Sequence, residues 1–478
     1  MTSAPGQEGP EASGRQHRRD GAVAGQGRAD TTAPPQGGAA GPALISATST
    51  VFKAEGLTGR LRALRERLRY TLGRPLTPYY LILGSASLLV VLGLIMVFSS
   101  SNITAIHQGL PGPYYFRKQL VAVLLGSVLL VAAARVPAAV HRVLAYPVLL
   151  GSIGAMVLVA IPGIGMKVNG NRNWLNFGFF QVQPSEFAKL ALLLWAADLL
   201  ARKQKAGTLT QWKHLLVPLV PGALVLLMLI MLGGDMGTSM ILVAMVFALL
   251  WMVGAPLRLF VATLGIAVVA CTALIITVPH RLDRLACIGT TTPVPGHDCF
   301  QALHGLYAFG LGGPFGTGLG AGYEKWGLLP EAHTDFIFAA TGEELGLVGT
   351  LSVIGLFAAL GYAGIRVAIG TKDTFVRYAA GAATTWIMAQ AMINLGSALG
   401  LLPIAGVPLP LFSYGGSAML SAMCALGMLL CFARSVPGAK AALAARSSKS
   451  RFRTGLRRVL PRRRTTARPA ARPPRRER

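Results

Sequence analysis

The chain has 478 residues, of which 53% are hydrophobic and 13% are charged, and its formal net charge is +27. Its mean hydropathy of +0.54 is more apolar than a soluble domain requires, which excludes an ordinary soluble protein. Apolar runs of about 20 residues recur along the chain, and this is the length that crosses a bilayer as a helix. The composition therefore predicts an all-α polytopic membrane protein.

Residues 1–78 precede the first apolar run. Residues 1–50 are rich in Gly, Ala, Pro and polar residues, which predicts disorder, and the first 40 residues lack the apolar core of a cleaved signal peptide. Residues 57–69, LTGRLRALRERLR, predict a basic amphipathic helix on the inner membrane surface. A solvated linker is the alternative interpretation of this segment.

About ten transmembrane helices are predicted within a membrane domain at 79–433. Their approximate ranges are 79–99, 119–134, 143–161, 184–201, 214–232, 237–254, 257–278, 336–364, 378–396 and 410–433. Lys and Arg are more frequent in alternate connections, and the positive-inside rule then places both termini in the cytoplasm. Residues 279–335 become one long extracytoplasmic loop between helices 7 and 8, and loops of this length are usually functional. No internal repeat is visible, which weighs against an inverted-repeat transporter.

The C-terminal segment 434–478 carries 16 Lys and Arg residues and one Glu. A basic tail beside the last helix predicts a disordered cytoplasmic segment attracted to anionic lipid. Phe452 is its only aromatic residue, so stacking on bases is disfavoured and we expect no nucleic-acid partner.

Two of the five cysteines, Cys287 and Cys299, lie 12 positions apart in the long loop. An extracytoplasmic location would favour a disulfide between them, and two free thiols are the alternative. Two cysteines at this spacing do not make a metal site.

The first polar cluster joins NGNRNW at 169–174 to QPSEFAKL at 183–190. Pro184 suits the first turn of a helix, Glu186 lies near the positive end of that helix, and Lys189 follows on the same face. One interpretation is a self-neutralising Glu186–Lys189 pair. The other is that Arg172 and Lys189 supply positive charge to an anionic ligand.

The second and third clusters are acidic. Asp235 in GGDMGTS stands between two predicted spans, where spacing alone favours a helix cap. In LPEAHTDFIFAATGEELG, residues 329–346, Asp335 precedes an apolar run and could also cap it, but His333 and Glu331 remain beside it. Glu343 and Glu344 fall inside the span and need partners, and we expect these to be Lys189 and Arg172.

Two further segments are rich in Gly or Pro. The prolines and glycines of LLPIAGVPLPLFSYGGSAM, residues 401–419, break the helix between the last two spans, and broken backbone at membrane depth needs protein or a cavity to cover it. Residues 310–322 lack the GxxxxGK[ST] pattern of a phosphate loop and predict a tightly packed loop.

These segments, in this order, resemble the SEDS family of bacterial cell-wall synthesis, which includes FtsW, RodA and SpoVE. The resemblance covers about residues 79–433 and favours the FtsW branch. LPEAHTDFIFA with GEELG is the most specific match, and QPSEFAK and SYGGS support it. The chain departs from the family pattern at Asn173, where a second Arg is usual, at Gly233-Gly234 before Asp235, and at Phe300-Gln301, where a Tyr-Gln pair is usual.

The resemblance implies peptidoglycan glycosyltransfer, in which lipid II is polymerised into glycan strands outside the membrane during cell division. The acidic residue that the family requires falls on Asp335, which we expect to be the general base of an inverting displacement. We expect Glu343 and Glu344 to be further catalytic acids. The expected substrate-binding residues are Arg172, Lys189, Trp174, Glu186, Asp235, His333, Gln301 and Ser413.

The resemblance also implies partners and a location. These are a cognate class B penicillin-binding transpeptidase, other divisome proteins, and the bacterial cytoplasmic membrane, with the division septum expected. No metal ligand set is predicted, although a divalent cation held by the acids is an alternative source of positive charge. The competing functions are a lipid II flippase or transporter and a non-catalytic divisome scaffold.

Overall fold

The computed structural model describes residues 59–60, 62–63, 65–67, 70–168, 171–178, 180–208, 218–276, 287–289, 292 and 299–445. The predictions for residues 1–50 and for most of the basic tail lie outside these residues. Residues 1–67 and 68–478 form separate units. In the first unit, the described positions between 59 and 67 are helical and exposed, in line with the helix predicted at 57–69.

Long helices make up most of the second unit. They are α2 (Thr77–His107), α3 (Tyr114–Arg135), α4 (Ala138–Ala160), α5 (Pro184–Lys205), α7 (Leu219–Leu232), α8 (Met236–Val253), α9 (Leu257–Ile276), α11 (Phe300–Gly312), α12 (Ile337–Gly370), α13 (Thr374–Ala398) and α14 (Gly416–Ser435). Every apolar run predicted as a span overlaps one of these helices. Among the described helices, six are long and apolar enough to cross a membrane, namely α2, α3, α4, α8, α12 and α14. The chain is therefore a mostly helical, multi-pass membrane protein.

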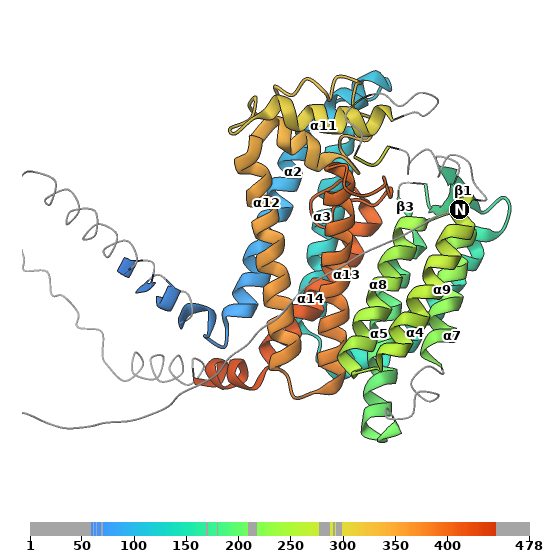
Figure 1. Cartoon of the computed structure of the whole chain (residues 1–478), viewed down its shortest axis with the longest axis vertical. Coiled ribbons are helices and arrows are strands. Elements are labelled where there is room, and N and C mark those ends of the chain that lie inside the picture. Colours follow the sequence, from blue (N-terminus) through green and yellow to red (C-terminus); the bar gives the residue numbers. More distant parts are fainter. Residues whose placement is uncertain are drawn as a thin grey trace, which may run out of the picture. The chain divides into compact units, whose positions relative to one another are not determined.

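Helix α13 packs against three other helices of the bundle, α12, α5 and α8 (Figure 1). Its buried face is rich in alanine, which lets neighbouring backbones approach closely. Helices α14 and α3 also pack closely through a small residue. A Cβ at Gly427 of α14 would lie only 2.4 Å from the carbonyl oxygen of Leu130 of α3.

Two elements that the sequence analysis did not predict lie in connections between helices. Strands β1 (Gly165–Val168), β2 (Asn171–Asn176) and β3 (Gln181–Val182) form an antiparallel sheet in the order β1-β2-β3, which places Arg172 on its central strand. Helix α11 packs against α12 and α13, across the end of the bundle where α12 begins (Figure 1). The strands have only four, six and two residues, too short to give a clear periodic pattern.

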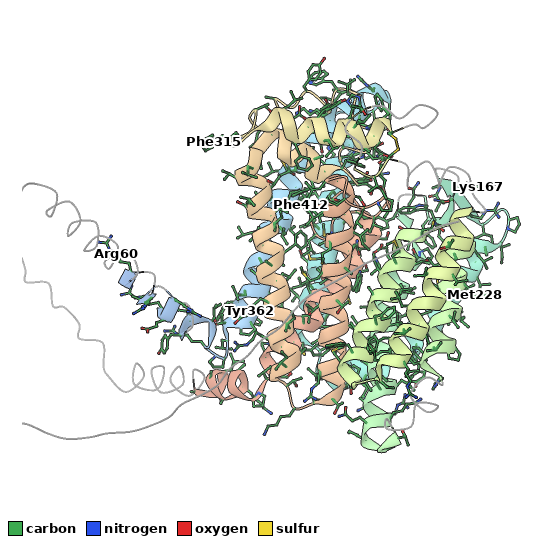
Figure 2. All side chains as sticks on the ribbon, in the orientation of Figure 1. Arg60, Lys167, Met228, Phe315, Tyr362 and Phe412 are labelled. Atoms are coloured by element: carbon green, nitrogen blue, oxygen red, sulfur yellow. A yellow bond between two sulfur atoms is a disulfide. The ribbon has the colours of Figure 1, made fainter. Side chains whose placement is uncertain are left out.

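The predicted span at 410–433 begins too early. Helix α14 starts at Gly416, and Leu411 has a φ of +65°, which a helix does not allow. The segment is nevertheless buried, and Phe412 lies inside the bundle (Figure 2). A Cβ at Gly93 of α2 would lie 2.4 Å from the Phe412 carbonyl oxygen, so only glycine allows this approach.

Candidate active site

Asp335 lies in the turn that leads into α12. The helix begins at Ile337 with Phe336 at its N-cap, so Asp335 precedes the cap position. Its carbonyl oxygen accepts a 2.8 Å hydrogen bond from Asn394 Nδ2 of α13, which also donates to the carbonyl of Val407 at 2.8 Å. One amide of α13 thus holds both the turn of Asp335 and the broken segment before α14.

The half-buried side chain of Asp335 borders a small cavity. Phe336, Asn394, Ser397 and the segment Ile404–Val407 form the rest of its wall. Asn394 Oδ1 is buried without a hydrogen-bond partner in the part of the chain that the structure describes. Buried acceptors are normally satisfied, so Asn394 is an unusual residue in this wall.

Glu343 and Glu344 anchor the glycine-rich loop that precedes them. Glu343 Oε1 accepts backbone hydrogen bonds from Tyr323 at 2.5 Å and Glu324 at 3.1 Å. Glu344 pairs with Lys325 Nζ at 2.7 Å and accepts a 2.6 Å hydrogen bond from Ser99 of α2. Both glutamates are 1% exposed, so their environment is that of a packed structural contact.

The prediction that Lys189 and Arg172 would neutralise these two acids is wrong. The cation is Lys325, 19 residues before Glu344. Lys325 lies in the loop predicted at 279–335, and sequence spacing alone does not show that this loop folds back on α12.

Lys189 is completely buried between α5, α13 and α14, with a relative exposure of 0%. Its ammonium pairs with Glu186 at 2.8 Å, donates to Gln390 Oε1 at 2.9 Å, and lies 5.1 Å from the centre of the Trp386 ring. Glu186 also accepts a 3.1 Å hydrogen bond from Ser421. This is the self-neutralising pair, and it leaves Lys189 no exposed surface toward a ligand.

Arg172 has the opposite environment. It borders a cavity of about 480 Å³ between α4, α5, α7 and the sheet. Lys167, Asn171, Asn173 and Ser185 line the polar part of this cavity; Met156, Val159, Leu229, Ile230 and Leu232 line the apolar part. Arg172 Nε is buried and has no hydrogen-bond partner within the described residues. The cavity therefore combines positive charge with an apolar wall.

Asp235 is a helix cap, as its spacing favoured. Its Oδ1 accepts from the backbone N–H of Thr238 at 2.9 Å, and its Oδ2 accepts from Gln183 at 2.9 Å and Ser185 at 3.0 Å. The carboxylate thus ties the start of α8 to the start of α5.

Residues between the end of α7 and the first turn of α8 pack closely against both cavity walls. A Cβ at Gly233, the C-cap of α7, would lie 1.9 Å from Asn173 Oδ1, and one at Gly237 of α8 would lie 2.1 Å from Val407 Cγ2. Asn173 borders the Arg172 cavity and Val407 borders the Asp335 cavity, so these two glycines allow both walls to approach.

His333 lies in a cluster of aromatic rings and is 6% exposed. Its ring centre is 4.8 Å from Tyr115 and 5.6 Å from Tyr414, and its Nδ1 has no hydrogen-bond partner among the described residues. Burial lowers the pKa of His333, while Glu331 acts in the opposite direction. Burial also raises the pKa of Tyr414 to about 12, so both rings are neutral near pH 7.

Three other predicted site residues have local roles. Ser413 is buried, and its hydroxyl accepts a 2.8 Å hydrogen bond from the Leu409 N–H. Gln301 of α11 donates to the carbonyl of Pro330 at 3.2 Å. Trp174 of β2 lies opposite Met166 of β1.

Sequence reasoning missed the amides that hold the broken segment. Gln119 of α3 is buried, donates to the Ser413 carbonyl at 3.0 Å and accepts from the Gly415 N–H at 3.1 Å. Gln390 donates to the Pro408 carbonyl at 2.9 Å. A lone amide in an apolar helix was the available signal, since such a group needs a partner.

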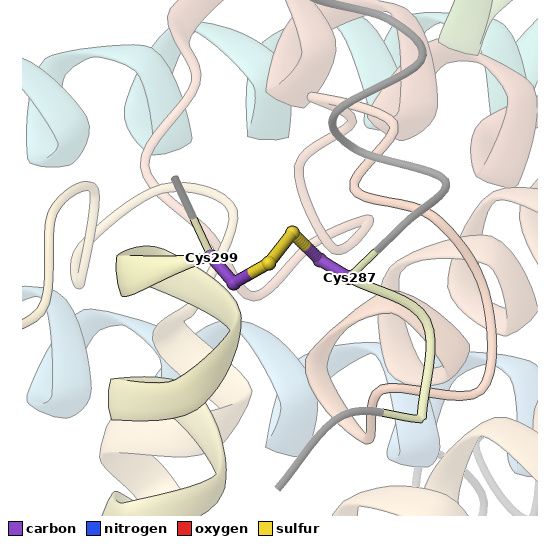
Figure 3. The surroundings of a disulfide bond; sticks show 2 residues. All are labelled: Cys287 and Cys299. Atoms are coloured by element: carbon purple, nitrogen blue, oxygen red, sulfur yellow. A yellow bond between two sulfur atoms is a disulfide. The ribbon is translucent and has the colours of Figure 1, made fainter. Parts of the chain in front are cut away.

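Cys287 and Cys299 form a disulfide (Figure 3). It links a short described segment, 287–289, to the N-cap residue of α11. As for metals, the described residues contain no group of three or more His, Cys, Asp or Glu that could hold an ion.

The chain is similar to known proteins. A protein of Mycobacterium tuberculosis named probable peptidoglycan glycosyltransferase FtsW is 38% identical over 382 residues, which cover 80% of this chain and 72% of that protein. Stage V sporulation protein E of Bacillus subtilis is 34% identical over 354 residues, covering 74% of this chain and 96% of that protein.

Two solved structures share the fold. The crystal structure of the rod shape determining protein RodA of Thermus thermophilus has a TM-score of 0.55 and 26% identity, covering 75% of this chain and 97% of that chain. A chain from a peptidoglycan synthase complex that coordinates polymerization and crosslinking has a TM-score of 0.59 and 26% identity, covering 74% and 97%. The family model for FtsW, RodA and SpoVE, described as cell cycle protein, matches residues 79–436, and the chain therefore belongs to this family.

Proposed function

We propose that the protein is a peptidoglycan glycosyltransferase that polymerises lipid II into glycan strands at the outer face of the cytoplasmic membrane during cell division. The observation that carries the proposal is Asp335, a half-buried acid that lines a small cavity together with Asn394 of α13. The relatives named peptidoglycan glycosyltransferase support the reaction class.

Asp335 acts as the general base in this proposal. The 4-hydroxyl of a GlcNAc unit gives its proton to the carboxylate while its oxygen forms a bond to the anomeric carbon of a MurNAc unit. The bond from that carbon to the lipid diphosphate breaks, and the diphosphate keeps the electron pair. The displacement inverts the anomeric centre, and a positioned base typically contributes roughly 100- to 10,000-fold in rate.

The diphosphate leaving group needs fixed positive charge where its negative charge develops. The Arg172 cavity suits this role better than Lys189, because Arg172 and Lys167 border open space whereas Lys189 is buried in an ion pair. The apolar wall of the same cavity suits the first part of a polyprenyl chain. A divalent cation remains a further source of positive charge in this proposal.

The topology that we propose has ten transmembrane helices, with both termini in the cytoplasm and residues 279–335 outside. Each predicted span overlaps a helix of the structure. The disulfide between Cys287 and Cys299 is typical of an oxidising compartment and supports an outer location for this loop.

We further propose a cognate class B penicillin-binding transpeptidase as the partner, with other divisome proteins at the septum. The support is the similarity to a chain of a peptidoglycan synthase complex that coordinates polymerization and crosslinking.

Purified protein supplied with lipid II in detergent, with and without the transpeptidase, tests the reaction. Glycan strands should form and should disappear with Asp335→Asn. A flippase would make no polymer in detergent, and a scaffold would add polymer only through its partner's own activity. Either result would overturn the proposal.

A further inference from the structure

Ile404 connects the disulfide to the segment that carries Asp335. It packs against two small hydrophobic clusters. The disulfide cluster contains Cys287, Cys299, Ala302 and Leu303. The second, which we name the α12-entry cluster, contains Ala308, Leu329, Ala332, Phe336 and Ala339. Because Phe336 follows Asp335 directly and Ile404 borders the Asp335 cavity, one side chain links the disulfide to the cavity wall.

A hydrogen bond makes a second connection. The N–H of Gly289, two residues after Cys287, donates to the carbonyl of Gly400 at 2.9 Å. Gly400 begins the broken segment between α13 and α14, and Asn394 holds the same segment further along, at the Val407 carbonyl. Ile404 and its neighbours therefore lie between a point fixed by α13 and an end fixed by the disulfide-linked loop.

We propose that the Cys287–Cys299 disulfide is a positioning element for glycosyl transfer, which holds Ile404 and the wall of the Asp335 cavity in place. This inference rests on the proposed function. An added dithiol such as dithiothreitol reduces this bond. The S–S bond breaks, Cys287 and Cys299 become thiols, and the dithiol is oxidised to a disulfide. The 287–289 segment then loses its disulfide cross-link to the N-cap residue of α11 and stays joined to it only through the main chain. Small displacements of a reacting group are costly, since about 1 Å can change a rate by roughly 100-fold.

The first test compares polymerisation of lipid II by the full chain when oxidised, after dithiothreitol, and after reoxidation. We expect the turnover number to fall by about 10- to 100-fold on reduction and to return on reoxidation, while the KM for lipid II stays within about twofold. Cys287→Ser/Cys299→Ser should be slow and unaffected by dithiothreitol. Cys424→Ser, which replaces a free cysteine in α14, is the matched control and should behave like the wild type.

Ile404→Ala tests the connection without changing a cysteine. It should lower turnover in the oxidised protein and add little in Cys287→Ser/Cys299→Ser, because both changes remove the same contact. The control is Leu401→Ala, in the same segment, because the side chain of Leu401 is 70% exposed. This change should leave turnover unaltered. Full additivity of Ile404→Ala and the cysteine changes would overturn the inference.

Amide hydrogen exchange gives a result that does not depend on activity. Reduction should speed exchange at residues 331–336 and 400–407 while leaving α3 and α14 protected. Unchanged exchange at both segments would overturn the inference, whether or not lipid II is polymerised. If polymerisation were normal and equally fast before and after reduction of the disulfide, the inference would also be overturned, and the proposed function would stand.

Discussion

The acids on the two sides of the start of α12 are only eight or nine residues apart, yet the structure uses them differently. Asp335 lies before the helix, half-buried beside a cavity. Glu343 and Glu344 lie inside the helix and hold the preceding loop through Tyr323 and Lys325, and Glu344 also accepts a hydrogen bond from Ser99 of α2. Asp335 borders a cavity, whereas Glu343 and Glu344 are each 1% exposed. Asp335 is therefore the acid to which we assign the chemistry in the proposed function.

Lys189 and Arg172 repeat this contrast among the cations. Lys189 has three partners and no exposure, whereas Arg172 borders a cavity of about 480 Å³ and its Nε has no hydrogen-bond partner among the described residues. Removing one partner of a buried ion pair is strongly destabilising, so Lys189 is placed to affect stability, and Arg172 is the cation to which we assign the ligand in the proposed function.

Asp335→Asn should reduce polymerisation of lipid II more than any other change proposed here. A small reduction would contradict the distinction between Asp335 and the two glutamates. The amide keeps the size of the side chain but cannot accept the hydroxyl proton, so polymerisation of lipid II should fall by roughly 100- to 10,000-fold. The thermal midpoint in detergent should stay within a few degrees of wild type. A matched Glu331→Gln, at an exposed acid four residues earlier, should retain activity. Near-normal polymerisation by Asp335→Asn would remove the general-base assignment.

Lys189→Met should mainly change stability. It leaves Glu186 buried without its cation, which typically costs about 3 to 5 kcal/mol, and the loss should appear as a lower thermal midpoint. Glu186→Leu combined with Lys189→Met should recover much of this loss, because a buried pair can be replaced by apolar groups at little cost.

Arg172→Ala is the contrasting variant for Lys189→Met. It should lower turnover of lipid II while leaving the thermal midpoint close to wild type, since its guanidinium borders open space. If Arg172→Ala unfolded the protein and a folded Lys189→Met were inactive, the two assignments would have to be exchanged.

Glu344→Gln should reduce polymerisation less than Asp335→Asn does. It leaves the buried Lys325 without its anionic partner, which typically costs about 3 to 5 kcal/mol, and it frees the loop that Gly320 and Lys325 attach to α12. Amide exchange should rise between residues 316 and 325, with polymerisation reduced but not abolished. A rate loss as large as that of Asp335→Asn, with unchanged exchange, would instead make Glu344 a catalytic group.

The helices were predictable because their apolar length has a direct physical cause, the thickness of the bilayer. The cap role of Asp235 was predictable for a similar reason, since it depends on local spacing. The partners of Glu344 were not, because Lys325 reaches it only after a glycine-rich loop folds back. The sequence shows which residues are charged, but it does not show which of them a folded loop brings together.

The candidate site shows the same limit. Asp335 was identified through a family resemblance and through its place before an apolar run, and its cavity depends on contacts that sequence spacing does not specify. Asn394 lies 59 positions away and holds the Asp335 carbonyl, and Gln119 lies 294 positions before the carbonyl that it contacts. Such long-range amide contacts require the packed bundle to be known.

The smallest expected effect concerns pH and the aromatic cluster beside Asp335. Because burial lowers the pKa of His333 below its ordinary value of 6.5, the unfolded chain binds a proton there at pH values where the folded protein does not. Stability is therefore highest above pH 6.5, declines as the pH falls below it, and levels off under the folded pKa. Tyr414, with a pKa of about 12, does not titrate in this range.

His333→Phe isolates this contribution, because phenylalanine can pack against Tyr115 and Tyr414 without binding a proton. The thermal midpoint of the wild type should fall between pH 7.5 and 5.5 by more than that of the variant. Other groups titrate in both proteins, so the difference between the two pH profiles reports His333 alone. Identical profiles would mean that acid reaches the ring without disturbing its packing, and the cluster would then not depend on a neutral His333.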